Sequence, residues 1–180
     1  MPLLKNHYTS EDYWNLPEGD RAELIDGKLY DMAPPSRIHQ QLVMELSGSV
    51  RDYIKSNHGK CLVYPAPFAV NLDADDKDWV EPDISVICDP NKLTDRGCSG
   101  APDLIFEIVS PSSRRMDYNR KNTLYSDAGV REYWIVDPAK ERVTVYEDDA
   151  APVIYPFAQD IPVGIYPGLT IKINDLLENY

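Results

Sequence analysis

The chain has 180 residues, of which 43% are hydrophobic and 12 are tyrosine, and its formal net charge is −12. This length suits one ordinary domain, and this composition excludes an intrinsically disordered chain. No apolar run approaches the roughly 20 residues that cross a bilayer, and residues 1–8 are too short and too polar for a signal peptide. We therefore expect a single cytoplasmic domain, spanning residues 1–180, with no membrane partner.

The negative charge counts against simple electrostatic binding of nucleic acid, which normally needs a basic face. Charge can nevertheless be segregated on a surface, and residues 113–121 contain Arg114, Arg115, Arg120 and Lys121. The alternative interpretation is that the acidity only keeps the protein in solution. The sequence leaves both interpretations open.

The three cysteines, Cys61, Cys88 and Cys98, lack the spacing of a metal site, and an odd number cannot all pair. Cys61 and Cys88 fall within apolar stretches, where cysteine often serves as a small core residue. We expect all three to be reduced thiols, as is usual in the cytoplasm.

The first 35 residues predict a helix followed by a β-hairpin. Thr9 or Ser10 can cap the helix, and acidic residues follow in its first turn. Asp26 and Gly27 form a strong hairpin turn signal. The expected elements are a helix within residues 9–18 and strands over residues 21–25 and 28–32. We expect this unit to be an N-terminal extension of the fold.

Residues 36–147 predict the core of the fold. Ser36 can cap a long helix, and Ile38, Leu42 and Leu46 recur at helical spacing. The expected order is a helix over residues 37–57, strands over 61–70, 80–88 and 103–109, a helix over 115–128 and strands over 131–136 and 142–147. The polar segment 89–100 is expected to be mobile. The order favours an α/β or α+β fold, with a mixed central sheet flanked by helices. Short strands over 153–157 and 169–173 and a helical turn over 174–179 complete the C-terminal part, residues 150–180.

The run 101–111 (APDLIFEIVSP) places Glu107 inside an apolar strand. A buried carboxylate is costly unless it is compensated, and a divalent metal is one natural compensation because hard cations take oxygen ligands. Asp83 enters a second apolar strand, so two acids on adjacent strands form the minimal skeleton of a magnesium-dependent nuclease. Asp103 is a rival ligand, but four residues along a strand span roughly 13 Å, too far to share one ion with Glu107.

Three parts of the chain resemble one known family. They are residues 100–113 (GAPDLIFEIVSPSS), the spaced residues Asp117, Lys121 and Tyr125, and residues 129–138 (GVREYWIVDP). Residues 23–27 (ELIDG), His39 and the Pro82–Asp83 pair also fit. From about residue 8 to residue 177, the chain resembles the Uma-type restriction endonuclease family. The resemblance implies the PD-(D/E)XK nuclease superfamily, whose core has the order helix, three strands, helix and strand.

The resemblance also implies a metal site. Asp83 and Glu107 would hold one or two Mg²⁺ together with the carbonyl of Ile108, and Mn²⁺ would substitute for Mg²⁺. Val109 stands where the superfamily places a lysine two residues after the acid. The resemblance assigns that role to Lys121, which would orient the attacking water and neutralise charge in the transition state.

Three further residues are supporting candidates in this assignment. Glu23 would complete the metal shell, and His39 would position water or phosphate. Asp117 stands four residues before Lys121, the spacing of a helical ion pair. Each has a simpler alternative: an exposed hairpin position for Glu23, a surface position for His39, and a purely structural ion pair for Asp117. Glu45 is an alternative acid on the first long helix.

The resemblance implies a magnesium-dependent endonuclease that hydrolyses phosphodiester bonds, with DNA as its partner and a homodimer as its assembly. The alternative is a nuclease-fold binding or regulatory module without catalysis, which the valine at position 109 and the charge of −12 favour. A third interpretation is an enzyme that acts on a different phosphate ester, since a fold does not settle a function.

Overall fold

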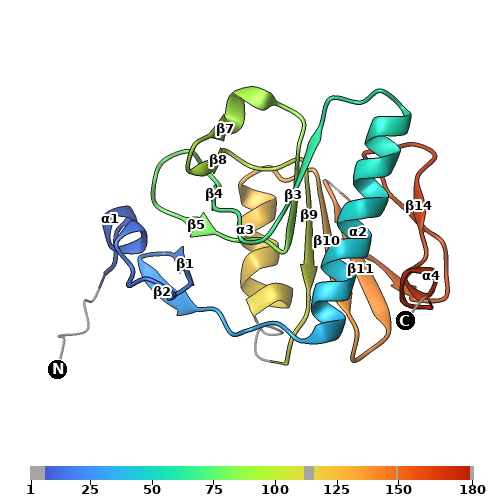
Figure 1. The fold of residues 1–180 in the computed structure, drawn as a ribbon, viewed down its shortest axis with the longest axis horizontal. Helices are drawn as coiled ribbons and strands as arrows, with labels where there is room; N and C mark the ends of the chain where they lie inside the picture. The colour runs from blue at the N-terminus through green and yellow to red at the C-terminus, as the bar shows by residue number, and fades with distance from the viewer. Residues whose placement is uncertain (1–6, 112–115, 149, 179–180) are drawn as a thin grey trace.

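The computed structural model describes residues 7–111, 116–148 and 150–178, and of Met116 and Asp117 it describes the backbone alone. Within these ranges it contains two six-stranded sheets and one two-stranded sheet. Figure 1 shows helix α2 (Arg37–Ser56) in front of the central sheet and helix α3 (Asn122–Asp127) behind it. The predicted mixed α/β architecture is confirmed. No helix in the described ranges is long and apolar enough to cross a membrane.

The central sheet has the strand order β12-β11-β10-β9-β6-β3. Strands β9 and β10 are parallel, and the other neighbouring pairs are antiparallel. The chain thus runs through α2, β3, β6, β9, α3 and β10, which is the predicted order of helices and strands. The strands are β3 (Leu62–Pro65), β6 (Ile84–Ile87), β9 (Leu104–Ile108), β10 (Glu132–Asp137), β11 (Arg142–Glu147) and β12 (Val153–Pro156).

Helix α2 covers one face of this sheet. It begins after Ser36, whose side chain accepts a hydrogen bond from the N–H of His39, as the sequence predicts for a cap. Its buried residues lie on one face and pack against Phe106 and Trp134. Burial of each such aliphatic side chain contributes about 1.5–3 kcal/mol. The same apolar layer includes parts of β13 (Ile161–Pro162), β14 (Thr170–Ile171) and α4 (Ile173–Leu177).

Helix α3 and the second sheet cover the opposite face. Tyr125 of α3 packs with Ile105, Tyr133 and Ile135 of the central sheet. Within the predicted helix over residues 115–128, Met116–Lys121 form a π-helical turn, hereafter the π-turn. Such turns widen a helix locally and often occur at functional sites. The predicted cap in residues 112 and 113 lies outside the described residues.

The second sheet has the order β2-β1-β5-β4-β8-β7. Its strands are β1 (Ala22–Ile25), β2 (Lys28–Asp31), β4 (Val70–Asn71), β5 (Trp79–Val80), β7 (Leu93–Thr94) and β8 (Gly97–Ser99). The continuous strands predicted over 61–70 and 80–88 are wrong, because each divides between the two sheets. Pro65, Pro67 and Pro82 stand at these breaks, where the missing N–H cannot continue a ladder. The segment predicted to be mobile forms the β7–β8 hairpin.

The N-terminal unit follows its prediction locally. Helix α1 (Ser10–Trp14) has Thr9 and Asp12 in a capping box. Asp26 and Gly27 form the hairpin turn, with φ angles of 50° and 69°. Strand β1 pairs with β5, so this N-terminal unit joins the second sheet.

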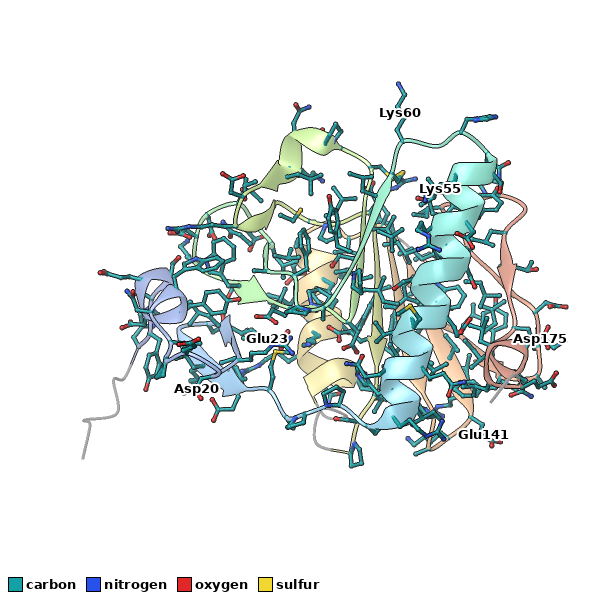
Figure 2. All side chains as sticks on the ribbon, viewed as in Figure 1. Asp20, Glu23, Lys55, Lys60, Glu141 and Asp175 are labelled. Carbon is teal, nitrogen blue, oxygen red and sulfur yellow. A yellow bond between two sulfur atoms is a disulfide. The ribbon has the colours of Figure 1, made fainter. Side chains whose placement is uncertain are left out.

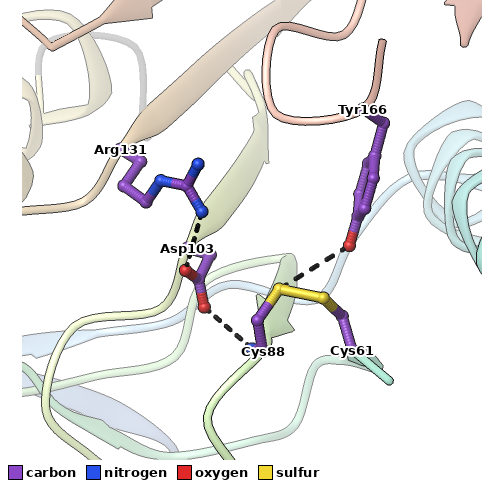
Figure 3. The surroundings of a disulfide bond; sticks show 5 residues. All are labelled: Cys61, Cys88, Asp103, Arg131 and Tyr166. Atoms are coloured by element: carbon purple, nitrogen blue, oxygen red, sulfur yellow. Dashed lines mark hydrogen bonds and ion pairs between the residues drawn. A yellow bond between two sulfur atoms is a disulfide. The ribbon is translucent and has the colours of Figure 1, made fainter. Parts of the chain in front are cut away.

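The prediction of three reduced thiols is wrong for two of the cysteines. Cys61 precedes β3 and Cys88 follows β6, and the register of these strands places them opposite each other. They form a disulfide, shown in Figure 3. An odd number of cysteines excludes complete disulfide pairing but allows one disulfide. The pairing of strands β3 and β6 brings Cys61 and Cys88 close enough to form it. Cys98 is free and buried, and burial raises its pKa to about 11.

Candidate active site

Strand pairing brings Asp83 and Glu107 next to each other. Asp83 directly precedes β6, and in the β6–β9 pair Ile84 lies opposite Phe106, the residue before Glu107. The N–H of Ile108, the residue after Glu107, donates a hydrogen bond to the Asp83 carboxylate. Both residues are largely removed from solvent, with exposed fractions of 9% and 4%. The structure therefore sets two buried carboxylates on adjacent strands, as the sequence predicted.

Asp83 is held by two hydrogen-bonding partners. Its Oδ2 accepts a hydrogen bond from the N–H of Ile108 at 2.7 Å and lies 3.1 Å from Nε2 of His39. His39 comes from the first turn of α2 and only 13% of its side chain is exposed, so the surface alternative is wrong.

Glu107 is held from the helical side. Its Oε1 accepts hydrogen bonds from Nζ of Lys121 at 2.8 Å and from the hydroxyl of Tyr125 at 2.6 Å. Lys121, the last residue of the π-turn, is 5% exposed. Val109 lies on the same strand face as Glu107 but packs in the apolar layer. The lysine next to Glu107 therefore comes from the helix and not from the strand.

Glu23 extends this arrangement to the second sheet. Its Oε1 lies 3.0 Å from Nζ of Lys121 and accepts a hydrogen bond from the N–H of Glu81 at 3.0 Å. Figure 2 labels Glu23 on β1, beside α3. The alternative of an exposed hairpin position is wrong, because Glu23 is 5% exposed. Lys121 thus bridges two buried carboxylates, which compensates charges that would be costly alone.

Two residues near the site had no functional role in the sequence assignment. Tyr125 was part of the family resemblance only, although its position four residues after Lys121 puts both on one helix face. Asp137 was interpreted as a turn residue, yet it is fully buried and accepts a hydrogen bond from the hydroxyl of Tyr118 at 3.3 Å. One step beyond the Ile108–Val136 pair, the register sets Asp137 beside Val109. Alternate residues of a strand face the same side, so Asp137 shares a face of β10 with the buried Tyr133 and Ile135. This spacing is the signal that could have identified Asp137 from the sequence.

Other candidates lie elsewhere or are not described. Asp103 is at the opposite end of β9, where its carboxylate binds the N–H of Cys88 at 2.8 Å and Arg131 at 3.3 Å (Figure 3). It is therefore no rival to Asp83. The side chain of Asp117 lies outside the described residues, so its ion pair with Lys121 stays a prediction. Glu45 is six residues beyond His39 on α2.

The donor set suits a hard divalent cation. In the described part of the chain, no three His, Cys, Asp or Glu side chains gather as a group that could hold a metal. Mg²⁺ does not require such a group, because it usually binds one or two carboxylates and keeps several waters. Asp83, Glu107 and the carbonyl of Ile108 supply two carboxylates and one further oxygen. By donor chemistry these residues fit Mg²⁺.

Comparisons with known proteins agree with this fold. A solved structure from Anabaena variabilis, described as "a putative nuclease belonging to DUF820", superposes with a TM-score of 0.78 at 21% identity, over 94% of this chain and 97% of that one. "Uncharacterized protein slr1290" of Synechocystis sp. is 24% identical over 139 residues, which cover 76% of this chain and 72% of that protein. The profile of the Uma2 family, described as "Putative restriction endonuclease", matches residues 10–174. The chain therefore belongs to the Uma2 family.

Proposed function

We propose that the protein is a metal-dependent endonuclease that hydrolyses the phosphodiester bonds of DNA. The observation that carries the proposal is a pair of buried acids on adjacent chain segments: Asp83 is bound to the N–H of Ile108, next to Glu107, and Glu107 is bound to the ammonium of Lys121. Membership in the Uma2 family supports the nuclease class. A Mg²⁺ held by Asp83, Glu107 and the carbonyl of Ile108 would lower the pKa of a water and offset charge on the phosphate.

The protein residues have separate tasks in this proposal. Lys121 orients the attacking water and offers a positive charge to the phosphate oxygens. Tyr125 fixes the Glu107 carboxylate through its hydroxyl, and His39 fixes Asp83 from α2. Glu23 holds the ammonium of Lys121 near Glu107. Because these contacts join a strand, two helical segments and the second sheet, the geometry is set before substrate arrives.

A second candidate is a nuclease-fold binding module without catalysis. The specific observation in its favour is that Lys121 contacts both Glu23 and Glu107, so these acids are compensated without any metal. In this candidate the buried cluster serves stability alone. The two candidates differ in whether the protein takes up a divalent ion.

Calorimetric titration with Mn²⁺ separates the two candidates. The nuclease proposal expects a binding site that Asp83→Asn and Glu107→Gln abolish. Asp103→Asn is the matched control, because it removes a carboxylate charge at the other end of β9 and should leave Mn²⁺ binding unchanged. Wild-type protein that takes up no Mn²⁺ would contradict the nuclease proposal and support the binding module.

Cleavage assays with Mg²⁺ or Mn²⁺ then test the reaction. Wild-type protein should cut plasmid or single-stranded DNA, and Lys121→Ala should lower the rate by at least about a hundredfold, the usual effect of losing a group that stabilises transition-state charge. Hydrolysis of a small phosphate ester such as p-nitrophenyl phosphate, with no DNA cleavage, would instead place the activity in a different phosphoesterase class.

A further inference from the structure

Cationic side chains gather on one side of the π-turn. Lys140 and Arg142 come from the turn and first residue of the β10–β11 hairpin, and both lie over the ring of Tyr118. The Lys140 Nζ and Arg142 Cζ atoms are 5.6 and 5.7 Å from the ring centroid. The hydroxyl of the same tyrosine donates to Asp137, which the strand register sets beside Val109 at the candidate site. This cationic pair therefore adjoins the site.

A third cation stands on the other side of the π-turn. The guanidinium of Arg120 lies over the ring of Tyr30, with Cζ 5.3 Å from the ring centroid, and also contacts its hydroxyl. Tyr30 is directly opposite Glu23 in the β1–β2 register, and Glu23 holds Lys121. Arg120 directly precedes Lys121 in the chain. Their partners, Tyr30 and Glu23, also lie opposite each other in the β1–β2 hairpin. We call Arg120, Lys140 and Arg142 the basic rim.

The rim cations differ from those cations of this acidic chain that pair with carboxylates. Arg51, Arg131 and Lys172 each form an ion pair with an aspartate. Within the described residues, the three rim cations have tyrosine rings as neighbours and no ion pair with a carboxylate. The charge of the rim is therefore available to an incoming anion.

We propose that the basic rim binds the phosphodiester backbone of a nucleic-acid strand and guides it across the candidate site. This inference rests on the proposed nuclease function. Lysine and arginine are the usual ligands of backbone phosphates, and such contacts position a strand without reading its sequence. Tyrosine rings beneath the cations hold them in place by cation–π attraction. The rim would give a chain of charge −12 a local group of cations beside the candidate site.

Fluorescence anisotropy with a labelled oligonucleotide tests the rim without catalysis, in EDTA and over a series of salt concentrations. The double variant Lys140→Gln/Arg142→Gln should weaken binding at least tenfold at low salt. It should also reduce the slope of log K against log salt by about two, since each phosphate contact contributes roughly 0.9. Lys140→Gln alone, at an exposed turn position, should reduce the slope by about one.

The matched control is Lys55→Gln/Lys60→Gln, which changes the net charge by the same amount. Figure 2 shows Lys55 and Lys60 at the top of the molecule, whereas Glu141 of the β10–β11 turn is at the bottom. Lys55 is about 24 Å along α2 from His39 at 1.5 Å per residue. This control should bind like the wild type. Equal losses in both doubles, or no loss in the rim variants, would overturn the inference.

Cleavage separates failure of the rim from failure of the nuclease proposal. If the wild type cleaves DNA and the rim double variant cleaves it with an unchanged KM, the rim inference is wrong and the nuclease proposal stands. If the wild type binds oligonucleotide through the rim but neither takes up Mn²⁺ nor cleaves, the nuclease proposal is wrong and the rim stands. A wild type that binds no oligonucleotide overturns the rim. Thermal unfolding of each variant checks that it is folded.

Discussion

The ammonium of Lys121 lies 2.8 Å from Oε1 of Glu107, although the two residues are 14 positions apart in the chain. The same nitrogen lies 3.0 Å from Oε1 of Glu23. One buried cation therefore joins the central sheet, the π-turn and the second sheet. Val109, two residues after Glu107 on the same strand face, packs among apolar side chains. Lys121 of the π-turn therefore supplies the positive charge that Val109 on the strand does not.

Replacing Lys121 by methionine should strongly destabilise the protein. The change leaves the buried carboxylates of Glu23 and Glu107 without their shared cation, and breaking a buried pair in this way costs about 3–5 kcal/mol. Urea unfolding measures the loss. The double variant Lys121→Met/Glu107→Gln should be less destabilised than the sum of its two single variants, because the residues are in contact. Additive losses would contradict a direct coupling.

A lysine at position 109 should partly replace Lys121 in catalysis. Residues 107 and 109 point to the same face of β9, so Val109→Lys would place an ammonium near Glu107. We expect Val109→Lys/Lys121→Met to cleave DNA measurably faster than Lys121→Met. Val109→Met/Lys121→Met, which adds bulk without charge, is the control and should stay inactive. Equal activity of the two double variants would show that the positions are not interchangeable.

The variant Tyr125→Phe should weaken the support of Glu107. It removes the hydroxyl that donates to Oε1 at 2.6 Å while keeping the ring in the core. A hydrogen bond to a charged group contributes about 1.5–3 kcal/mol, and we expect a loss of that size in the free energy of unfolding. Mn²⁺ affinity should fall as well. Tyr146→Phe, on a half-buried tyrosine of the same apolar layer, should change stability by less than about 0.5 kcal/mol.

Stability should depend on pH through Glu132. Its carboxylate is buried, which raises its pKa; hydrogen bonds from Trp134 and from the N–H groups of Gly164 and Ile165 lower it, and nearby Glu147 raises it. The net shift is upward. The folded protein therefore holds this proton more tightly than the unfolded chain does. The resulting stability is fully present below the ordinary carboxyl pKa of about 4.3 and is lost as pH rises through the folded pKa.

The variant Glu132→Gln removes this titration. Its stability relative to the wild type should increase as the pH rises above the ordinary carboxyl pKa of about 4.3, and any change in hydrogen bonding adds only a constant offset. Chemical unfolding at several pH values measures the difference. Asp175→Asn, on an exposed residue of α4, is the control and should show a smaller pH-dependent difference. A difference independent of pH would contradict the upward pKa shift.

The Cys61–Cys88 disulfide can be tested by counting the free thiols of the protein. Alkylation of protein denatured without reductant should modify one thiol, that of Cys98, whereas three modified thiols would restore the sequence-based expectation. Closing a loop with a sequence separation of 27 should stabilise the folded state by about 3–4 kcal/mol through chain entropy. Reductant should therefore lower the melting temperature of the wild type. The melting temperature of Cys61→Ser/Cys88→Ser should not respond to reductant.

Local patterns in the sequence determined the elements and the main acids. The caps at Thr9 and Ser36, the turn at Asp26 and the apolar stripe of α2 each depend on neighbours a few residues apart, so they are visible along the chain. The resemblance to the Uma-type family added Lys121, and the structure places that residue on Glu107.

Only the tertiary structure decided which side chains meet. The Cys61–Cys88 bond, the contact of His39 with Asp83 and the bridge from Glu23 to Lys121 all join segments far apart in the chain. Their proximity follows from strand register and from how the helices pack on the sheet. A one-residue change of register would send each side chain to the opposite face, and no local pattern encodes that choice.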